Sequence, residues 1–180
     1  MYRTFPTLAL LVASSFFATS CNNPGHKAAA IDGAEGSGIV TRGDDERTAQ
    51  LRGALEAFTR NDQDYAKDYI AEGHKIHMAD GSEPVGLDEW NAFADASHRA
   101  FKDMEFSGLT MITSDYPKQG VWSYAWCTFL ATSRATGEQF RFPLHIMWDW
   151  DGDKVVREFH FADTTRFNEH LEESLAAIDG

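Results

Sequence analysis

Two ionisable residues, Asp163 and His77, stand in segments whose apolar residues alternate as in β-strands. Asp163 shares its parity with Phe159 and Phe161, so a regular strand places its carboxylate beside an apolar face. A carboxylate in such a place is costly unless it is paired or used. His77 lies in the segment His74–Met78, and histidine titrates close to neutral pH. Both side chains are therefore candidates for general acid/base catalysis.

Asp163 also has a purely structural interpretation. It stands directly before Thr164, Thr165 and Arg166, and an aspartate at such a point is a good start for a helix. A cap and an acid/base role do not exclude each other, so both interpretations stay open.

Metal binding is not expected. His74 with His77, and His160 with Asp163, are each three residues apart, and such pairs point to opposite faces of a regular strand. The aspartates at 149–153 lack the glycine and glutamate positions of a calcium-binding loop. We therefore predict no metal site.

Other site chemistries lack their motifs. Ser123 is not followed by the second glycine of a nucleophile elbow, and no phosphate-binding loop or dinucleotide fingerprint is present. We therefore expect no cofactor. The formal net charge of −12 makes nucleic acid an unlikely partner.

Aromatic residues offer a surface for an apolar ligand. Tyr124 and Trp126 share one face of the predicted strand Val121–Thr132, and Trp148 and Phe161 lie in the hairpin that follows. Either face of the first strand is a candidate for burial, so its aromatic residues belong to the core, to a dimer surface or to a pocket. If they face the pocket, all four residues are candidate ligand contacts.

The first 46 residues differ from the remainder. Residues 1–20 have a basic start and a short apolar run, as in a secretory signal, and Ala18-Thr19-Ser20-Cys21 resembles the lipobox of bacterial lipoproteins. Residues 21–46 are rich in Gly, Ala, Asn and Asp, which predicts a flexible tether. We expect an exported protein, periplasmic or on the cell surface, that touches the membrane only through a lipid on Cys21. Cleavage as an ordinary signal peptide is the alternative.

Residues 47–180 are expected to form one α+β domain. Helical spacing precedes strand alternation along the chain, which favours helices covering one face of a curved antiparallel sheet. The expected helices are 47–60, 62–73, 87–102 and 167–178, and the expected strands are 74–78, 105–113, 121–132 and the hairpin 140–163.

Three sequence features resemble the nuclear transport factor 2-like superfamily, and its SnoaL-like branch in particular. They are Phe58-x-x-Asn61-Asp62, the segment Gly81–Gly86, and Trp150–Val155 followed eight residues later by Asp163. The resemblance implies a conical fold with an apolar pocket at its wide end and an outer sheet face through which a homodimer forms. It also implies that Asp163 takes the place of the cyclase base. Ketosteroid isomerases carry their aspartate in the strand that here reads His74–Met78, where His77 is the nearest titratable residue.

Two functions follow as expectations. The first is a ligand-binding domain for a small hydrophobic molecule, without catalysis or with an unknown activity. The alternative is a cofactor-independent isomerase or cyclase that uses Asp163 or His77 as the acid/base, with Tyr124 stabilising developing charge.

Overall fold

The computed structural model describes residues 39–179 of the chain. The predicted signal peptide, Cys21 and most of the predicted tether lie outside the described residues. Within the tether range, residues Val40–Arg42 form an edge strand, β1, so the sheet begins before residue 47.

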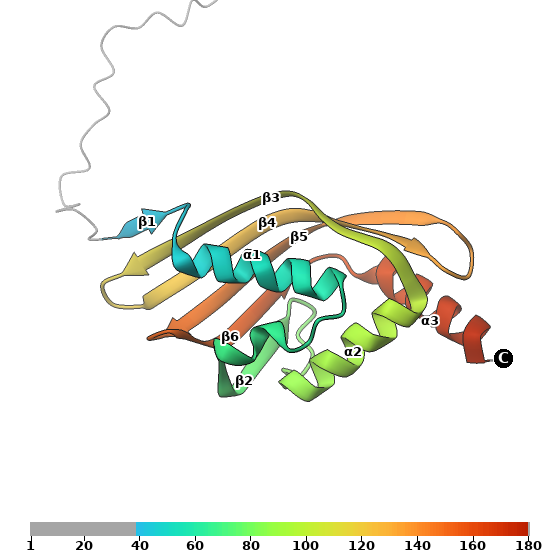
Figure 1. Ribbon diagram of the computed structural model, residues 1–180, viewed down its shortest axis with the longest axis horizontal. Coiled ribbons are helices and arrows are strands. Elements are labelled where there is room, and N and C mark those ends of the chain that lie inside the picture. Colours follow the sequence, from blue (N-terminus) through green and yellow to red (C-terminus); the bar gives the residue numbers. More distant parts are fainter. Residues whose placement is uncertain (1–38, 180) are drawn as a thin grey trace, which may run out of the picture. The chain divides into compact units, whose positions relative to one another are not determined.

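The described residues form one six-stranded sheet with helices packed on one face (Figure 1). The strand order is β1-β3-β4-β5-β6-β2. Neighbouring strands are antiparallel except β2 and β6, which run parallel. The remaining strands are β2 (Ile70–Met78), β3 (Phe101–Tyr116), β4 (Gly120–Ser133), β5 (Gln139–Asp151) and β6 (Lys154–Phe161). The α+β prediction is confirmed, with a mixed sheet in place of a purely antiparallel one.

Alternation along β5 fixes the inner face of the sheet. Leu144, Ile146, Trp148 and Trp150 are all buried, as their spacing of two predicts. In β4, which pairs with β5, the inward residues include the small Ser123 and Ala125 and, farther along, Phe129. Trp122, Tyr124 and Trp126 have the opposite parity and point to the outer face.

Two irregularities bend β3 around the helices. Asp103 and Gly108 have φ angles of 53° and 66°, and each lies where the pairing of β3 with β4 shifts register. Such bulges increase the local twist and bend of a strand. The bends let the long strands β3 and β4 curve toward one side.

A bulge in β6 decides which of its residues face inward. Trp150 pairs with Val155, but the preceding residue, Asp149, pairs with Arg157, so Val156 has no partner on β5. This extra residue reverses the parity of everything that follows in β6. Regular alternation predicts Phe159 and Phe161 on the apolar inner face, and the bulge turns them outward instead.

The helices lie on the concave side of the sheet, as Figure 1 shows. They are α1 (Glu46–Thr59), the short 3₁₀ helix η1 (Tyr65–Asp68), α2 (Leu87–Ala100) and α3 (Thr165–Asp179). The helix expected over 62–73 is limited to η1, because β2 already begins at Ile70. Leu51 and Leu55 of α1 pack against Met111, Ile146 and Trp148 of the sheet.

Buried hydrogen bonds fasten the start of α1 to the sheet. The Asp45 carboxylate caps the helix by accepting from the Thr48 N–H at 2.9 Å, and it also accepts from the Thr113 hydroxyl at 3.2 Å. That hydroxyl lies 2.8 Å from the Ser123 hydroxyl, which accepts from the Trp150 indole N–H at 2.9 Å. This chain of bonds satisfies the polar groups beneath α1.

Candidate functional site

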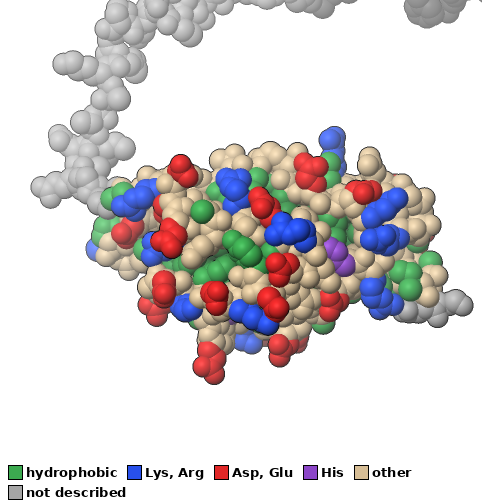
Figure 2. All heavy atoms as spheres, viewed as in Figure 1, with side chains coloured by type: hydrophobic (Ala, Val, Ile, Leu, Met, Phe, Trp, Pro, Cys, Tyr) green, Lys and Arg blue, Asp and Glu red, His purple; other side chains and the backbone are tan. Residues whose placement is uncertain are grey.

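A cavity of about 160 Å³ lies between the concave sheet face and the helices α1, η1 and α2. Its walls are mostly apolar and aromatic, and include Phe58, Trp90, Phe93, Phe106, Phe129 and Trp148. Figure 2, in the same view as Figure 1, shows hydrophobic side chains near the centre of the visible surface, among acidic and basic ones. A cavity with this lining suits a small, largely apolar molecule.

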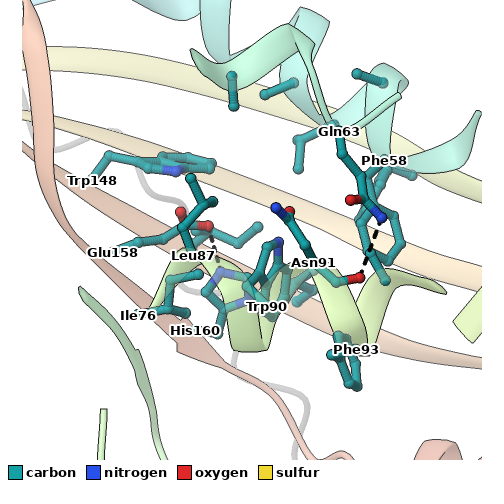
Figure 3. Close-up of a pocket in the computed structure, with 18 of the residues that line it drawn as sticks. Phe58, Gln63, Ile76, Leu87, Trp90, Asn91, Phe93, Trp148, Glu158 and His160 are labelled. Carbon is teal, nitrogen blue, oxygen red and sulfur yellow. Dashed lines mark hydrogen bonds and ion pairs between the residues drawn. The ribbon is translucent and has the colours of Figure 1, made fainter. Parts of the chain in front are cut away.

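One polar cluster interrupts the apolar wall. The His160 imidazole Nε2 and the Glu158 carboxylate Oε1 are 2.5 Å apart, and the two residues are drawn with a dashed line in Figure 3. His74 Nε2 lies 3.6 Å from Glu158 Oε2. The exposed fractions of the His74, Glu158 and His160 side chains are 1%, 13% and 8%. The cluster therefore combines a carboxylate and two imidazoles in a site that excludes most water.

The strand pairing explains how these residues meet. Glu158 is the cross-strand partner of Trp148 on β5 and of Ile76 on β2, so its side chain shares their face. His160 pairs with Met78 of β2. It projects inward two residues beyond Glu158. The centres of the His160 and Trp90 rings are 5.0 Å apart, in an edge-to-face arrangement. The β6 bulge is thus the local cause of the acid/base pair in the cavity.

Burial sets the protonation of the flanking groups. Burial lowers the pKa of His74, against the opposing effect of the nearby Glu158 carboxylate, so the neutral imidazole is favoured. Burial also raises the pKa of the Tyr69 hydroxyl, and the negative charge of Glu158 raises it further. Tyr69 is therefore a neutral phenol beside the anion.

Amide side chains lie at the helical end of the cavity. Gln63 Nε2 donates to the Asn91 carbonyl at 3.3 Å and to the Asp95 carboxylate at 2.7 Å, and Asn61 donates to the same carboxylate at 3.0 Å. Asn61 has a φ of 57° and ends α1 in a tight turn. These bonds tie the break after α1 to α2, and Figure 3 shows Gln63 and Asn91 on that side.

The structure corrects the predicted position of Asp163. Its neighbours Ala162 and Thr164 line the cavity, but Asp163 does not. Its exposed carboxylate accepts from the Thr165 N–H at 3.1 Å at the start of α3, and hydrogen bonding to the Thr165 hydroxyl and N–H holds the pKa of the carboxyl below its usual value. The capping interpretation describes this geometry, and the cavity contains a different carboxylate.

Four other candidate residues lie on the outer face. His77 stacks on Phe159 at 4.5 Å, because it alternates with the inward residues His74 and Ile76. Tyr124, Trp126 and Phe161 surround His145, with ring centres 4.9 to 6.2 Å away. The Tyr124 hydroxyl lies 3.0 Å from that of Tyr116, and Tyr124 does not line the cavity. Of the four proposed ligand contacts, only Trp148 lines the cavity.

Sequence reasoning did not identify Glu158, His160 and His74 as a group. Glu158 and His160 alternate with Phe159 and Phe161, so the same segment carries two faces of different chemistry. The sequence does show two ionisable residues, Glu158 and His160, in the strand that pairs with the strand of Trp148. Which face they occupy depends on the bulge at Val156, and no residue type at that position indicates a bulge.

Two further features of the described part of the chain are relevant. Among residues 39–179, no group of three or more His, Cys, Asp or Glu side chains is arranged to hold a metal ion. Within the same residues, no helix has the length and apolar character needed to cross a membrane.

Comparison with solved structures shows the same fold in several proteins. A proposed polyketide cyclase of Xanthomonas campestris pv. campestris is 15% identical, with 69% of this chain and 95% of that chain covered and a TM-score of 0.56. IdmH of Streptomyces antibioticus, also a proposed polyketide cyclase, is 18% identical over 71% and 99% of the two chains, with a TM-score of 0.54. PrhC of Penicillium brasilianum is 13% identical over 73% and 89%, with a TM-score of 0.58.

Sequence comparison adds the family. No curated protein sequence matches the chain significantly. The profile of the SnoaL-like domain matches residues 51–158, which run from α1 to the cavity carboxylate. Because this match covers more than half of the chain, the chain belongs to the family of SnoaL-like domains.

Proposed function

We propose that this domain binds a small, largely apolar molecule in the cavity and transfers a proton on it, with Glu158 and His160 as the acid/base pair. The observation that carries the proposal is the 2.5 Å contact between a carboxylate and an imidazole on the wall of an otherwise apolar cavity. Carboxylates and imidazoles are common proton-transfer groups. A site with little water strengthens their effect on a bound molecule.

The chemistry needs no group beyond these side chains. The Glu158 carboxylate takes a proton from a C–H bond that an adjacent carbonyl of the ligand makes acidic. In an isomerisation the proton returns to another atom of the same molecule. In an internal ring closure the carbanion forms a C–C bond to a second carbonyl carbon of the ligand, the π bond of that carbonyl opens, and its oxygen takes the proton. The pair with His160 orients Glu158, and Trp90 and Trp148 restrict the position of the bound molecule.

Hydrogen exchange on 2-tetralone, a small apolar ketone with acidic C–H bonds, tests this function. We expect the wild-type domain to accelerate deuterium uptake from D₂O, followed by NMR, relative to buffer alone. Glu158→Gln should reduce this acceleration roughly 100-fold or more, since a general base contributes on that order. Asp163→Asn is the matched control, because Asp163 lies outside the cavity, and it should exchange like the wild type.

A binding function without catalysis is the second candidate. It is favoured by the walls of the cavity, which are mostly aromatic and aliphatic, and by the direct pairing of Glu158 with His160. Binding of 2-tetralone without accelerated exchange would support this candidate and contradict catalysis.

The cellular setting is a separate proposal. We propose that the protein is exported and held at the membrane by a lipid on Cys21, which the signal-like segment 1–20 and the lipobox-like residues 18–21 support. Mass spectrometry of the mature chain from its host should find a diacylglyceryl group on Cys21, and an unmodified thiol there would contradict this proposal.

A second copy of the chain is the proposed partner of the outer sheet face. Trp126 and Phe161 are 43% and 42% exposed on this face. Farther along the same face, next to Trp122, the Asp149 carboxylate is bound by the Arg157 guanidinium at 2.5 Å, which compensates its charge. An aromatic face of this kind can associate with itself without repulsion between like charges.

A further inference from the structure

His74 is a buried polar residue without a hydrogen-bond partner. Its side chain is 1% exposed, and neither ring nitrogen is bonded to any other described residue. The nearest carboxylate oxygen, Glu158 Oε2, lies 3.6 Å from Nε2, which is too far for a hydrogen bond. Buried polar groups are nearly always bonded, so an unpaired imidazole needs an explanation.

The position of His74 suggests that its partner comes from the cavity. His74 is on the cavity wall together with Glu158. Oε1 of Glu158 is taken by His160, while Oε2 is the oxygen nearer to His74. A carboxylate oxygen and an imidazole nitrogen therefore stand side by side at the same place on the wall without bonding each other.

The two groups together define what they can bind. Burial favours neutral His74, which has one N–H donor and one acceptor nitrogen. The Glu158 carboxylate only accepts. In the tautomer that carries the hydrogen on Nε2, the nitrogen nearer to Glu158, a ligand atom that contacts both groups accepts from the imidazole and donates to the carboxylate. A hydroxyl group does both, whereas a ketone or an ether oxygen only accepts.

We propose that His74 and Glu158 form a recognition site for a hydroxyl group on a largely apolar ligand, such as a phenol. This inference rests on the proposed function of the cavity and adds a hydroxyl group to the ligand proposed there; Glu158 Oε2 has a second lone pair for the C–H bond next to the carbonyl. The apolar wall, including Ile76 and Trp148, encloses the hydrocarbon part. Tyr69, whose pKa is raised by burial and further by the charge of Glu158, is a neutral donor on that wall.

Three probes of similar size test the proposal: toluene, 4-methylphenol and 4-methylanisole. Binding is measured by calorimetry and by NMR titration. To the wild type, 4-methylphenol should bind about tenfold more tightly than the other two, the change expected for a hydrogen bond that involves a charged group. Toluene binding reports on the apolar cavity alone, and the ratio between probes reports on the hydroxyl site.

Substitutions at position 74 test whether the imidazole causes the preference for 4-methylphenol over toluene. In His74→Leu the preference for 4-methylphenol should fall to about twofold or less, while toluene binding is kept. His74→Gln, which supplies a donor and an acceptor at this position, should recover part of the preference for 4-methylphenol. The matched control is His145→Leu on the outer face, where the preference should stay at the wild-type value.

The outcomes separate the two proposals. Equal binding of the three probes to the wild type, or an unchanged preference in His74→Leu, would overturn the hydroxyl site and leave the apolar cavity intact. Failure of every probe to bind would contradict the proposed function itself. If His74→Leu does not fold, the ¹⁵N resonances of His74 in the wild type decide the question. They should shift with 4-methylphenol and not with toluene, and equal shifts would overturn the site.

Discussion

The two faces of the β5–β6 hairpin have opposite characters. The inner face carries Trp148, Glu158 and His160, which are buried around a cavity. The outer face carries His145, Phe159 and Phe161, whose aromatic rings stack on neighbouring strands and are partly exposed. The ionisable pair is thus buried and the phenylalanines face solvent, the reverse of what residue type alone suggests.

This difference shows that register can outweigh hydrophobicity over a short strand. The long strand β5 has six apolar residues at a spacing of two, from Phe140 to Trp150, and its inner face is determined by them. The eight-residue strand β6 follows β5 through pairing, and the bulge at Val156 sets its parity. Glu158 and His160 face the cavity because the register of β6 is set by its pairing with β5 and by the bulge, and not by the hydrophobic residues of β6 itself.

Deletion of Val156 together with Arg157 is the largest perturbation of this comparison. It makes Glu158 follow Val155, so regular pairing with β5 would turn Glu158 and His160 outward and Phe159 and Phe161 inward, whereas deletion of Val156 alone keeps the pair Trp148–Glu158 and its inward face. Two phenylalanine rings forced into a packed interior strain it, so we expect the double deletion to lower the free energy of unfolding by about 3 kcal/mol. Urea denaturation followed by circular dichroism measures it.

Val156→Ala is the control for the deletion. It keeps the bulge and removes two methyl groups from a half-buried side chain, so the loss should be about 1 kcal/mol. A double-deletion variant as stable as Val156→Ala would show that the register of β6 does not determine the inner face.

The fold could be predicted from long, regular patterns, and the site could not. The alternation in β5 and the helical spacing of Leu51 and Leu55 each extend over several turns or residue pairs, and burial confirms both. The candidate site depended on the parity of short segments in β2 and β6. In both strands a register shift intervenes, after Ile70 in β2 and at Val156 in β6. Backbone irregularities of this kind leave little trace in residue types.

A tryptophan from each face offers a direct comparison. Trp148 is 3% exposed and Trp126 is 43% exposed. Truncation of the buried ring leaves a void in the core, so Trp148→Ala should lower the free energy of unfolding by about 3 kcal/mol or more. Trp126→Ala loses mainly ring stacking with His145 and should cost about 1 kcal/mol. Urea denaturation at low protein concentration measures both, and equal losses would contradict the distinction between the faces.

The same pair of variants tests the proposed second copy. Sedimentation at high protein concentration should find that Trp126→Ala weakens self-association, because it removes an exposed ring from the outer face. Trp148→Ala should associate as the wild type does wherever it remains folded. A wild-type chain that stays monomeric at high concentration would exclude the outer face as a dimer contact.

The smallest expected effect concerns pH and isolates His74 on the inner face. Its folded-state pKa is lowered, mainly by burial, with Glu158 opposing and His160 and His77 adding to the decrease. The unfolded chain therefore binds a proton at a higher pH than the folded one. The contribution of His74 to stability is complete above the unfolded value of about 6.5 and is lost as the pH falls below it. Urea denaturation between pH 7.5 and 5.5 should show the wild type losing stability relative to His74→Leu. At pH 7.5 the leucine variant should be as stable as the wild type or more so, because it removes an unpaired buried polar group. Parallel stability curves for the two proteins would mean that His74 is not the buried neutral imidazole from which the hydroxyl site was inferred.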